Sequence, residues 1–361
     1  MNKKIPKKNI AFLITSLGFG GAETQLDFIT SEVSKKDTVH IITLIEIKKS
    51  KEIKNINLIN LDIKKNLYSL FKCLHFLKKF LIKNKIDTLV TFNFHPNLLG
   101  SLLKLLRIKT IIMTSIRTSF FGGYIRKKII KFICHFSDKI IFNSKNVLNT
   151  YVDTLNVRSK NMIVIYNYTP ISKISINKDH QNKNANSPFQ WIAVGRIVPA
   201  KNYKNLIEAI KILKNNNYMF LLRIIGDGSN FGSIQNLINR HNLNSEIEML
   251  GFKNNPSEYY KLSDGFVLSS SWEGFPNSLL EAVSYRLPVV STMVGGVNEI
   301  IENGKNGIIV SPNSPNELAS GMLKIMNSSR KKLNGYINIS ENILLHQHGF
   351  SNTIKLWVNE L

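Results

Sequence analysis

The chain has 361 residues, of which 43% are hydrophobic and 20% charged, and a formal net charge of +24 at pH 7. This length favours two domains over a single core, and the hydrophobic content excludes a protein that is disordered throughout. The two cysteines, Cys73 and Cys134, fit neither a metal site nor a disulfide framework, so we expect an intracellular, reduced protein. No apolar stretch reaches the length of a transmembrane helix, and the run at 10–14 is too short for a signal peptide, so a soluble or peripheral protein is predicted.

Short β-branched runs alternate with amphipathic segments along the first half of the chain. The runs predict strands, the amphipathic segments predict helices, and their alternation is typical of a parallel sheet with helices on both faces. We therefore expect residues 1–170 to form a Rossmann-like, doubly wound α/β domain. The predicted strands are 9–15, 39–45, 88–92, 110–116, 139–144 and 162–167, and the predicted helices include 22–35, 66–84, 97–106 and 124–136.

A polar stretch, SKISINKDHQNKNANSP at 172–188, has the composition of a linker and predicts a domain boundary at 171–188. The alternative is a surface loop inside one larger domain. Beyond this stretch the alternation restarts, which predicts a second doubly wound domain at 189–344. In such folds ligands bind at the carboxyl ends of strands, and here that places a site in a cleft between the two domains. The strands predicted in the second domain are 189–195, 220–226, 247–251, 265–271, 288–292 and 307–312, and the helices are 202–215, 230–242, 256–263, 277–285, 296–304 and 315–327.

A glycine cluster, TSLGFGGAETQL at 15–26, follows the first predicted strand and opens a helix. Gly20 and Gly21 allow a ligand to approach the backbone closely, and the free N–H groups of the helix favour an anion. The spacing does not match the G-x-G-x-x-G pattern of a dinucleotide site. A turn that only connects strand to helix is the alternative.

Two cations follow the first strand of the second domain, in VGRIVPAKN at 194–202. Arg196 comes directly after the strand, and Lys201 lies five residues on, just before a helix. Two cations on one phosphate group can hold a diphosphate and stabilise it as a leaving group without a metal. The alternative is a pair of solvated surface charges.

Two carboxylates, Glu273 and Glu281, flank a predicted helix start in SSSWEGFPNSLLEAV. Asn277 or Ser278 is expected to cap this helix, whose first turn then offers free N–H groups to a phosphate. We expect Glu273 to bind a sugar hydroxyl and Glu281 a ribose, because carboxylates accept hydrogen bonds from vicinal diols. An ordinary helical glutamate, favoured by the helix dipole, is the alternative for Glu281.

Seven short motifs follow one another along the chain: GFGGAE, VIYN, VGRIVPAKN, GDGS, LGF, SSSWEGFPNSLLEAVSYRLPVVST and VGGVNEII. Together they resemble glycosyltransferase family 4, the group 1 glycosyltransferases of bacterial surface polysaccharide synthesis. The resemblance covers most of the chain and is most specific at 190–303. Asn298 departs from the family pattern, which often has proline at this position.

The resemblance implies a GT-B fold of two Rossmann-like domains, with a C-terminal helix at about 345–361 that returns to the first domain. It implies retaining, metal-independent transfer of a sugar from a UDP-linked or other nucleoside-diphosphate sugar to a lipid-linked glycan or saccharide acceptor, in capsule, O-antigen or exopolysaccharide synthesis. The leaving diphosphate would take the proton of the acceptor hydroxyl, so no strong base, metal or other cofactor is expected. The alternatives are a nucleotide-sugar epimerase of the same fold, a non-catalytic module that binds sugar nucleotides, and a basic membrane- or nucleic-acid-binding protein.

The resemblance also implies roles for single residues. Arg196 and Lys201 match the cations on the diphosphate, Glu273 the contact to the donor sugar, and Glu281 the contact to the ribose. Arg117 is a candidate for binding acceptor or phosphate, and His95 matches a histidine near the donor sugar, with a buried or capping histidine as the alternative. The remaining donor contacts implied are Gly20, Gly21, Gly251, Phe252, Phe275, Pro276, Asn277, Ser278 and Leu279.

The positive charge is concentrated in the first half, where 29 Lys and Arg face 10 Asp and Glu in residues 1–170. The amphipathic basic segments at 64–85 and 124–136 suggest peripheral binding to an anionic membrane, at the inner face of the cytoplasmic membrane. Outer helices with a solvated basic face, or a compositional bias of the whole chain, would explain the same charge. No nucleic-acid partner is expected, because stacking aromatics and known binding motifs are missing from the sequence.

Overall fold

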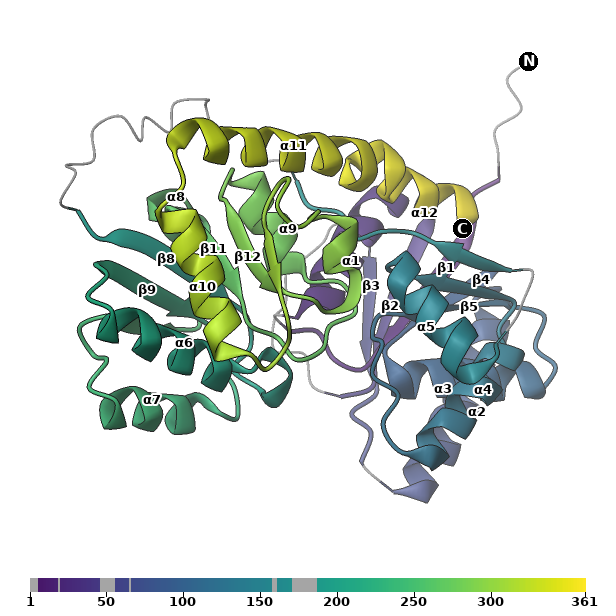
Figure 1. Ribbon diagram of the computed structural model, residues 1–361. Helices are drawn as coiled ribbons and strands as arrows, with labels where there is room; N and C mark the ends of the chain where they lie inside the picture. Colours follow the sequence, from purple (N-terminus) through teal and green to yellow (C-terminus); the bar gives the residue numbers. More distant parts are fainter. Residues whose placement is uncertain (1–5, 19, 46–55, 65, 158–160, 171–186) are drawn as a thin grey trace, which may run out of the picture. The chain divides into compact units, whose positions relative to one another are not determined.

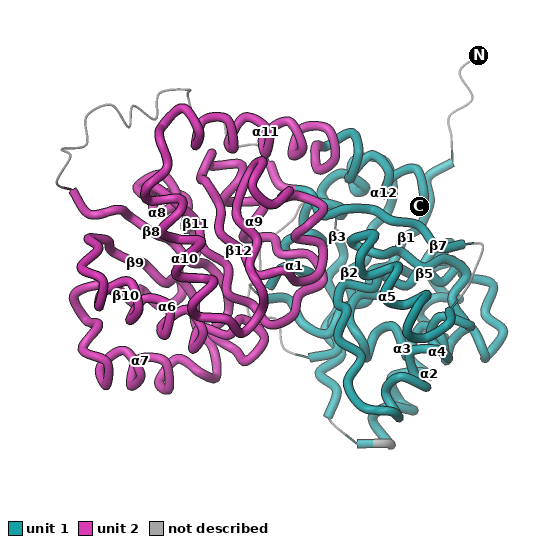
Figure 2. The backbone as a smooth tube through the Cα atoms, viewed as in Figure 1, with its two compact units in different colours: residues 1–168, 350–361 teal, residues 169–349 magenta. Residues whose placement is uncertain are grey.

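The computed structural model describes residues 6–18, 20–45, 56–64, 66–157, 161–170 and 187–361. The predicted linker at 171–188 lies outside the described residues, apart from its last two positions. The chain forms two compact units, coloured separately in Figure 2. Unit 1 comprises Met1–Tyr168 and Phe350–Leu361, and unit 2 comprises Thr169–Gly349.

The sheet of unit 1 has seven parallel strands in the order β3-β2-β1-β4-β5-β6-β7 (Figure 1). The central strands are almost fully buried, as their β-branched sequences predict. The edge strand β3 was not predicted, because its residues INLIN are partly exposed and mix apolar with polar side chains. The strands are β1 (Asn9–Ile14), β2 (Thr38–Thr43), β3 (Ile56–Asn60), β4 (Thr88–Phe92), β5 (Ile111–Ile116), β6 (Lys139–Phe142) and β7 (Met162–Val164).

Helices cover both faces of this sheet. The helices α1 (Gly21–Val33) and α12 (Ile354–Glu360) pack together on one face, where Trp357 stacks on Phe92 with ring centroids 5.9 Å apart. The last helix therefore completes the core of unit 1, as the resemblance implies. It begins at Ile354 rather than at about 345, because residues 345–348 end the preceding helix, which belongs to unit 2. The other face carries α2 (Leu67–Lys83), α3 (Phe94–Leu105), α4 (Tyr124–His135) and α5 (Lys145–Leu155).

Unit 2 repeats the design with six parallel strands in the order β10-β9-β8-β11-β12-β13. The predicted strand positions agree with the observed ones to within a few residues. The strands are β8 (Phe189–Val194), β9 (Phe220–Ile225), β10 (Ile247–Gly251), β11 (Gly265–Leu268), β12 (Val289–Thr292) and β13 (Ile308–Val310).

The core of unit 2 lies between its sheet and the helices α6 (Tyr203–Asn215), α7 (Phe231–Arg240) and α10 (Pro315–Met326). The other face carries α8 (Ser257–Leu262) and α9 (Asn277–Ser284), and α11 (Arg330–His348) packs on α9 (Figure 1). Two differences from the sequence prediction occur here. The helix predicted at 296–304 is only a short 3-10 turn, Gly295–Glu299, and α11 was not predicted, because polar residues and Gly335 interrupt its apolar pattern.

Both sheets reverse their strand order at one point. In unit 1, β4 lies beside β1, and in unit 2, β11 lies beside β8. Ligands of doubly wound sheets bind outside the carboxyl ends of strands at such switch points. Most of the site residues predicted from the sequence follow these strands directly. Among the described residues, no helix combines the length and the apolar character needed to cross a bilayer.

Candidate functional site

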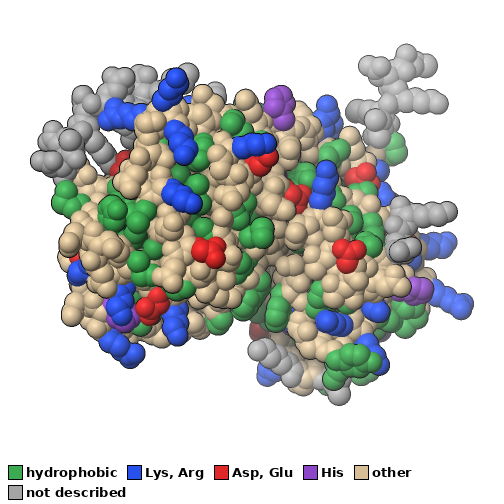
Figure 3. Space-filling model, viewed as in Figure 1, with side chains coloured by type: hydrophobic (Ala, Val, Ile, Leu, Met, Phe, Trp, Pro, Cys, Tyr) green, Lys and Arg blue, Asp and Glu red, His purple; other side chains and the backbone are tan. Residues whose placement is uncertain are grey.

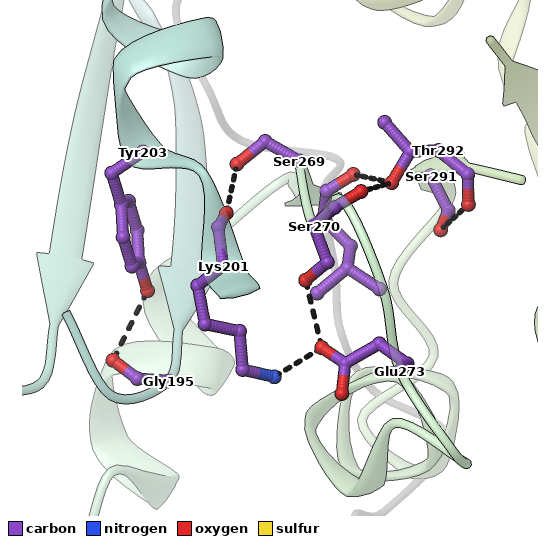
Figure 4. Close-up of polar contacts among 9 residues, drawn as sticks. Gly195, Lys201, Tyr203, Ser269, Ser270, Glu273, Ser291 and Thr292 are labelled. Carbon is purple, nitrogen blue, oxygen red and sulfur yellow. Dashed lines mark hydrogen bonds and ion pairs between the residues drawn. The ribbon is translucent and has the colours of Figure 1, made fainter. Parts of the chain in front are cut away.

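The two cations predicted to bind a phosphate, Arg196 and Lys201, lie just beyond β8. Lys201 closes the 3-10 turn Pro199–Lys201, and its Nζ lies 2.5 Å from Oε1 of Glu273 (Figure 4). Both side chains are largely buried, with 18% and 14% of their surfaces exposed. Arg196 is exposed, and its guanidinium makes no hydrogen bond or ion pair within the part of the chain that the structure describes. Beyond the end of β8, Lys201 is therefore held in an ion pair, whereas the side chain of Arg196 is exposed.

The Lys201–Glu273 ion pair corrects one expectation. No lysine or arginine is adjacent to Glu273 in the sequence, and only donor hydroxyls were expected as its partners. In the structure, Oε1 of Glu273 accepts hydrogen bonds from Lys201 and, at 2.7 Å, from the hydroxyl of Ser270. Lys201 reaches Glu273 because the ends of β8 and β11 are adjacent in the sheet, whereas Ser270 lies three residues before Glu273 in the same segment.

Hydrogen bonds to backbone oxygens hold this strand end in place. The hydroxyl of Thr292 donates to the carbonyl of Ser270 at 2.7 Å, and the hydroxyl of Ser269 donates to the carbonyl of Lys201 at 3.0 Å (Figure 4). Ser269, Ser270 and Thr292 are all buried. The sequence prediction assigns no role to the SSS run before Glu273, although small hydroxyl residues after a buried strand indicate such a network.

A glycine pair in the 3-10 turn that follows β12 supports the backbone of Glu273. Gly295 has φ +51°, and a Cβ there would lie 2.5 Å from the carbonyl oxygen of Gly274 and 2.7 Å from that of Glu273. The N–H of Gly296 donates to the carbonyl of Gly274 at 3.0 Å. Position 295 therefore requires glycine for both its conformation and its space.

The helix α9 begins at Asn277, the first residue of the predicted range 277–285, but its cap differs from the expected one. Its N-cap is Pro276, so the prediction that Asn277 or Ser278 caps the helix is wrong. No side chain caps this end, and the buried hydroxyl of Ser278 has no hydrogen-bond partner among the described residues. Uncapped N–H groups at a helix start favour an anion. The side chains of Phe275 and Leu279 are buried, so only their backbone can contact a ligand.

Glu281 lies one turn into α9. Its Oε2 accepts a hydrogen bond of 3.0 Å from the hydroxyl of Tyr260. Burial raises the pKa of the Glu281 carboxyl above its usual value, although the bond from Tyr260 and the charge of Lys201 lower it. Lys201 pairs with Glu273 and its charge also acts on Glu281, so unit 2 brings Lys201, Glu273 and Glu281 into one neighbourhood.

The last predicted residues of unit 2 end the strand β10. Gly251 has φ +66°, and its carbonyl accepts a hydrogen bond of 2.9 Å from the N–H of Gly226 at the end of β9. Phe252 follows with 44% of its surface exposed. An exposed aromatic ring next to two strand ends can stack on a planar ligand such as a nucleobase.

The predicted residues of unit 1 also follow strands. Gly20 is the N-cap of α1 and Gly21 its first residue, with no side-chain cap. Arg117 follows β5, lies 5.6 Å over the ring of Phe92 and donates to the side-chain oxygen of the buried Asn167. Burial lowers the pKa of Arg117 to about 10, although Glu23 acts in the opposite direction. Asn167 ends the VIYN motif and was given no role from the sequence.

His95 is exposed and is the second residue of α3, which begins at Phe94 rather than at 97. The alternative of a buried histidine is therefore wrong. Its ring contacts that of Phe94, with centroids 5.5 Å apart. In the described parts of the chain, no three His, Cys, Asp or Glu side chains form a group that could hold a metal ion.

Two family models match the chain. A model described as "Glycosyltransferase Family 4" matches residues 19–172, and one described as "Glycosyl transferases group 1" matches residues 175–342. The model boundary therefore lies close to the boundary between the units.

Three relatives illustrate the similarity in sequence. The chain is 29% identical over 347 residues to the N-acetylgalactosamine-N,N'-diacetylbacillosaminyl-diphospho-undecaprenol 4-alpha-N-acetylgalactosaminyltransferase of Campylobacter jejuni, covering 92% of this chain and 93% of the relative. It is 26% identical to the UDP-Gal:alpha-D-GlcNAc-diphosphoundecaprenol alpha-1,3-galactosyltransferase of Escherichia coli, covering 74% and 72%. It is 34% identical to the uncharacterized glycosyltransferase MJ1178 of Methanocaldococcus jannaschii, covering 53% of this chain but only half of that protein.

The fold is also shared with solved structures. The sucrose-phosphate synthase of Thermosynechococcus elongatus superposes with a TM-score of 0.84 and 16% sequence identity, covering 98% of both chains. This likeness confirms the predicted GT-B fold.

Proposed function

The chain belongs to the glycosyltransferases described by the group 1 and family 4 models, and from this premise we propose a reaction for it. It transfers a sugar from a nucleoside-diphosphate sugar, UDP-linked, to a lipid-linked glycan or saccharide acceptor. The convergence of Lys201, Glu273 and Glu281 beside an uncapped helix start carries this proposal. A nucleoside-diphosphate sugar needs cations to bind its diphosphate and carboxylates to accept hydrogen bonds from its sugar hydroxyls.

The donor diphosphate is bound by Arg196, Lys201 and the first turn of α9. Lys201 has three N–H donors and uses one on Glu273, so the others remain available to a phosphate oxygen. The guanidinium of Arg196 is exposed and has no partner among the described residues, so it can bind a phosphate. The two cations and the helix start can neutralise the leaving diphosphate, so no divalent metal takes part in this proposal.

The carboxylates bind the two sugars of the donor. Glu281 accepts hydrogen bonds from the ribose, and Glu273 contacts the transferred sugar. Because Lys201 and Ser270 share one oxygen of Glu273, that carboxylate has a defined orientation before the donor arrives. Such positioning accounts for much of the rate enhancement where the enzyme supplies no strong base.

The reaction proceeds with retention at the anomeric carbon. The bond from this carbon to the diphosphate oxygen breaks, and a bond to the acceptor oxygen forms on the same face. The proton of the acceptor hydroxyl passes to the leaving diphosphate oxygen. Arg196 and Lys201 stabilise the negative charge that develops there.

The acceptor is attached to a membrane lipid, in the synthesis of a capsule, O-antigen or exopolysaccharide. The names of the relatives from C. jejuni and E. coli contain diphospho-undecaprenol, a lipid-linked diphosphate. A second observation concerns the surface of unit 1. The helices α2 and α4, which flank α3 on one face of the sheet, expose apolar side chains. Apolar side chains gather beside Lys and Arg on the lower right of Figure 3. The exposed apolar residues on these two helices include Tyr68, Phe71, Phe76, Ile82, Tyr124 and Ile125.

A surface that is both basic and apolar suits the inner face of the cytoplasmic membrane. We therefore place the protein there as a peripheral enzyme. His95 and Arg117 of unit 1 are proposed to contact donor sugar and acceptor, and Gly20 and Gly21 to lie under the diphosphate.

One experiment tests this proposal directly. Purified protein is screened by thermal shift with UDP-, GDP-, CDP- and dTDP-sugars, and each stabilising donor is assayed with undecaprenyl-diphosphate-linked saccharides in the presence of EDTA. We expect one donor to raise the melting temperature and to yield a lengthened saccharide with the donor's anomeric configuration. Conversion of the donor to an epimer without transfer, or binding of no donor, would overturn the proposal.

A further inference from the structure

Tyr260 is a buried residue of α8 to which the sequence assigns no role. Its hydroxyl donates to Oε2 of Glu281 at 3.0 Å. We propose that Tyr260 is a positioning residue that orients Glu281 toward the donor ribose and makes the site prefer ribonucleotides to deoxyribonucleotides. This inference rests on the proposed function, because it assumes that Glu281 binds the ribose.

The ring of Tyr260 has little freedom to move. Only 1% of its surface is exposed, and it stacks on Tyr285 with centroids 5.0 Å apart and an angle of 7° between the planes. The ring of Phe266 lies 6.5 Å away on β11. The hydroxyl is also 3.4 Å from the carbonyl of Ser278 in the first turn of α9. The hydroxyl is therefore held at one point against α9.

The protonation of this pair makes Tyr260 a donor and Glu281 an acceptor. Burial and the neighbouring Glu281 raise the pKa of Tyr260, so its hydroxyl keeps its proton. A buried carboxylate is stable only when hydrogen bonds satisfy it. Tyr260 supplies one such bond to Oε2.

The second oxygen of Glu281 is open. Oε1 has no hydrogen-bond partner within the described segments of the chain. The hydrogen bond from Tyr260 to Oε2 fixes the rotation of the carboxylate. Oε1 therefore points in a defined direction, in which it can accept a hydrogen bond from a ligand. A ribose presents two adjacent hydroxyls to such an oxygen, whereas a deoxyribose lacks one of them. Discrimination between the two sugars therefore depends on Tyr260 as well as on Glu281.

The test measures binding of UDP, GDP and their 2′-deoxy forms to four proteins and one control variant. These are wild type, Tyr260→Phe, Glu281→Gln and the double variant. The control is Tyr259→Phe, which removes a hydroxyl from the adjacent residue of α8 that does not contact Glu281. Phenylalanine keeps the ring and its stacking, and the melting temperature of each variant verifies folding.

We expect Tyr260→Phe to weaken binding of the ribonucleotide about tenfold and to leave binding of the deoxy form nearly unchanged. The double variant should bind no more weakly than Glu281→Gln alone, because Tyr260 acts through Glu281. In transfer assays, Tyr260→Phe should raise KM for the donor and leave kcat within about twofold.

Three results would overturn the inference: equal losses for both nucleotide forms, additive losses in the double variant, or a Tyr260→Phe protein that binds both forms as Tyr259→Phe does. Failure of the proposed function looks different, because wild type would then bind neither nucleotide.

Discussion

Lys201 and Glu273 lie 72 positions apart in the chain, yet their side chains form an ion pair of 2.5 Å beside the switch point of the second sheet. The pair is largely buried, and the same carboxylate oxygen also accepts from Ser270. Each partner therefore fixes the other before any donor binds. This relationship links the two motifs that the sequence treats separately, one for phosphate and one for sugar.

Lys201→Ala should reduce the transfer rate at least a hundredfold, because the diphosphate loses a cation and Glu273 loses its orientation. Leaving a mostly buried carboxylate without its charged partner should also cost about 1–3 kcal/mol of unfolding free energy. The matched control is Lys204→Ala on α6, which removes an exposed lysine three residues away. Steady-state kinetics and thermal unfolding provide the two measurements. Undiminished turnover in Lys201→Ala would remove this residue from the mechanism.

Ser270→Ala should lower kcat about tenfold, because Glu273 loses a hydrogen-bond donor that helps to fix its carboxylate. The stability cost should be about 1 kcal/mol for one buried hydrogen bond. Ser291→Ala is the control, since Ser291 is equally buried and its hydroxyl bonds the Thr292 carbonyl instead of Glu273. We expect a similar loss of stability in the control with wild-type kcat. Equal activity losses in both variants would show that the effect is only structural.

Gly295→Ala should reduce both stability and activity. Its φ of +51° costs an L-residue about 1 kcal/mol, and the added Cβ would press on the carbonyls of Glu273 and Gly274. Gly304→Ala separates these effects, because Gly304 has φ +79° with open space around its Cβ position. The control should lose stability from strain alone and keep its activity. If Gly295→Ala behaved like the control, the support of the Glu273 loop by Gly295 would be disproved.

Donor binding should weaken as the pH falls through the raised pKa of Glu281, since only the charged carboxylate accepts hydrogen bonds with both oxygens. This loss should begin above the ordinary carboxyl pKa of 4.5. The effect of the Glu281 charge on the stability of the fold has the opposite sign. A raised pKa means that the folded protein holds this proton more tightly than the unfolded chain, so the charged group costs stability as the pH rises from about 4.5.

Isothermal titration with UDP between pH 4.5 and 8 measures the binding effect. In Glu281→Gln the acidic loss of affinity should disappear, and the stability of this variant relative to wild type should increase as the pH rises. A wild-type affinity that is flat over this range would contradict the expectation.

Binding to phosphatidylglycerol vesicles should weaken about tenfold when Tyr124 and Ile125 are both changed to serine. These residues expose 71% and 74% of their surfaces at the start of the basic helix α4. Met219→Ser is the control, because Met219 is 63% exposed on unit 2. Vesicle co-sedimentation at 50 and 500 mM salt measures the apolar and the electrostatic contributions to membrane binding. Binding that responds to neither the variants nor the salt would leave the lysines of α4 without a membrane role.

The order of strands and helices could be predicted because their local patterns are strong. In unit 2 the predicted strand at 247–251 coincides with β10, and the helix at 315–327 differs from α10 by one residue. Prediction failed where the local pattern is weak. The edge strand β3 is half exposed, and α11 owes its stability to packing on α9 more than to its own sequence.

The site shows the same division. The identities of Arg196, Lys201, Glu273 and Glu281 as candidates came from residue types placed directly after predicted strands and at a helix start, which are local properties of the chain. Their partners could not be predicted, because a hydrogen bond between side chains depends on which strand ends are neighbours. Strand order arises from the packing of whole βαβ units, and no short segment carries it. For this reason the bonds of Glu273 to Lys201 and of Glu281 to Tyr260 emerge only once β11 lies beside β8 and α8 beside α9.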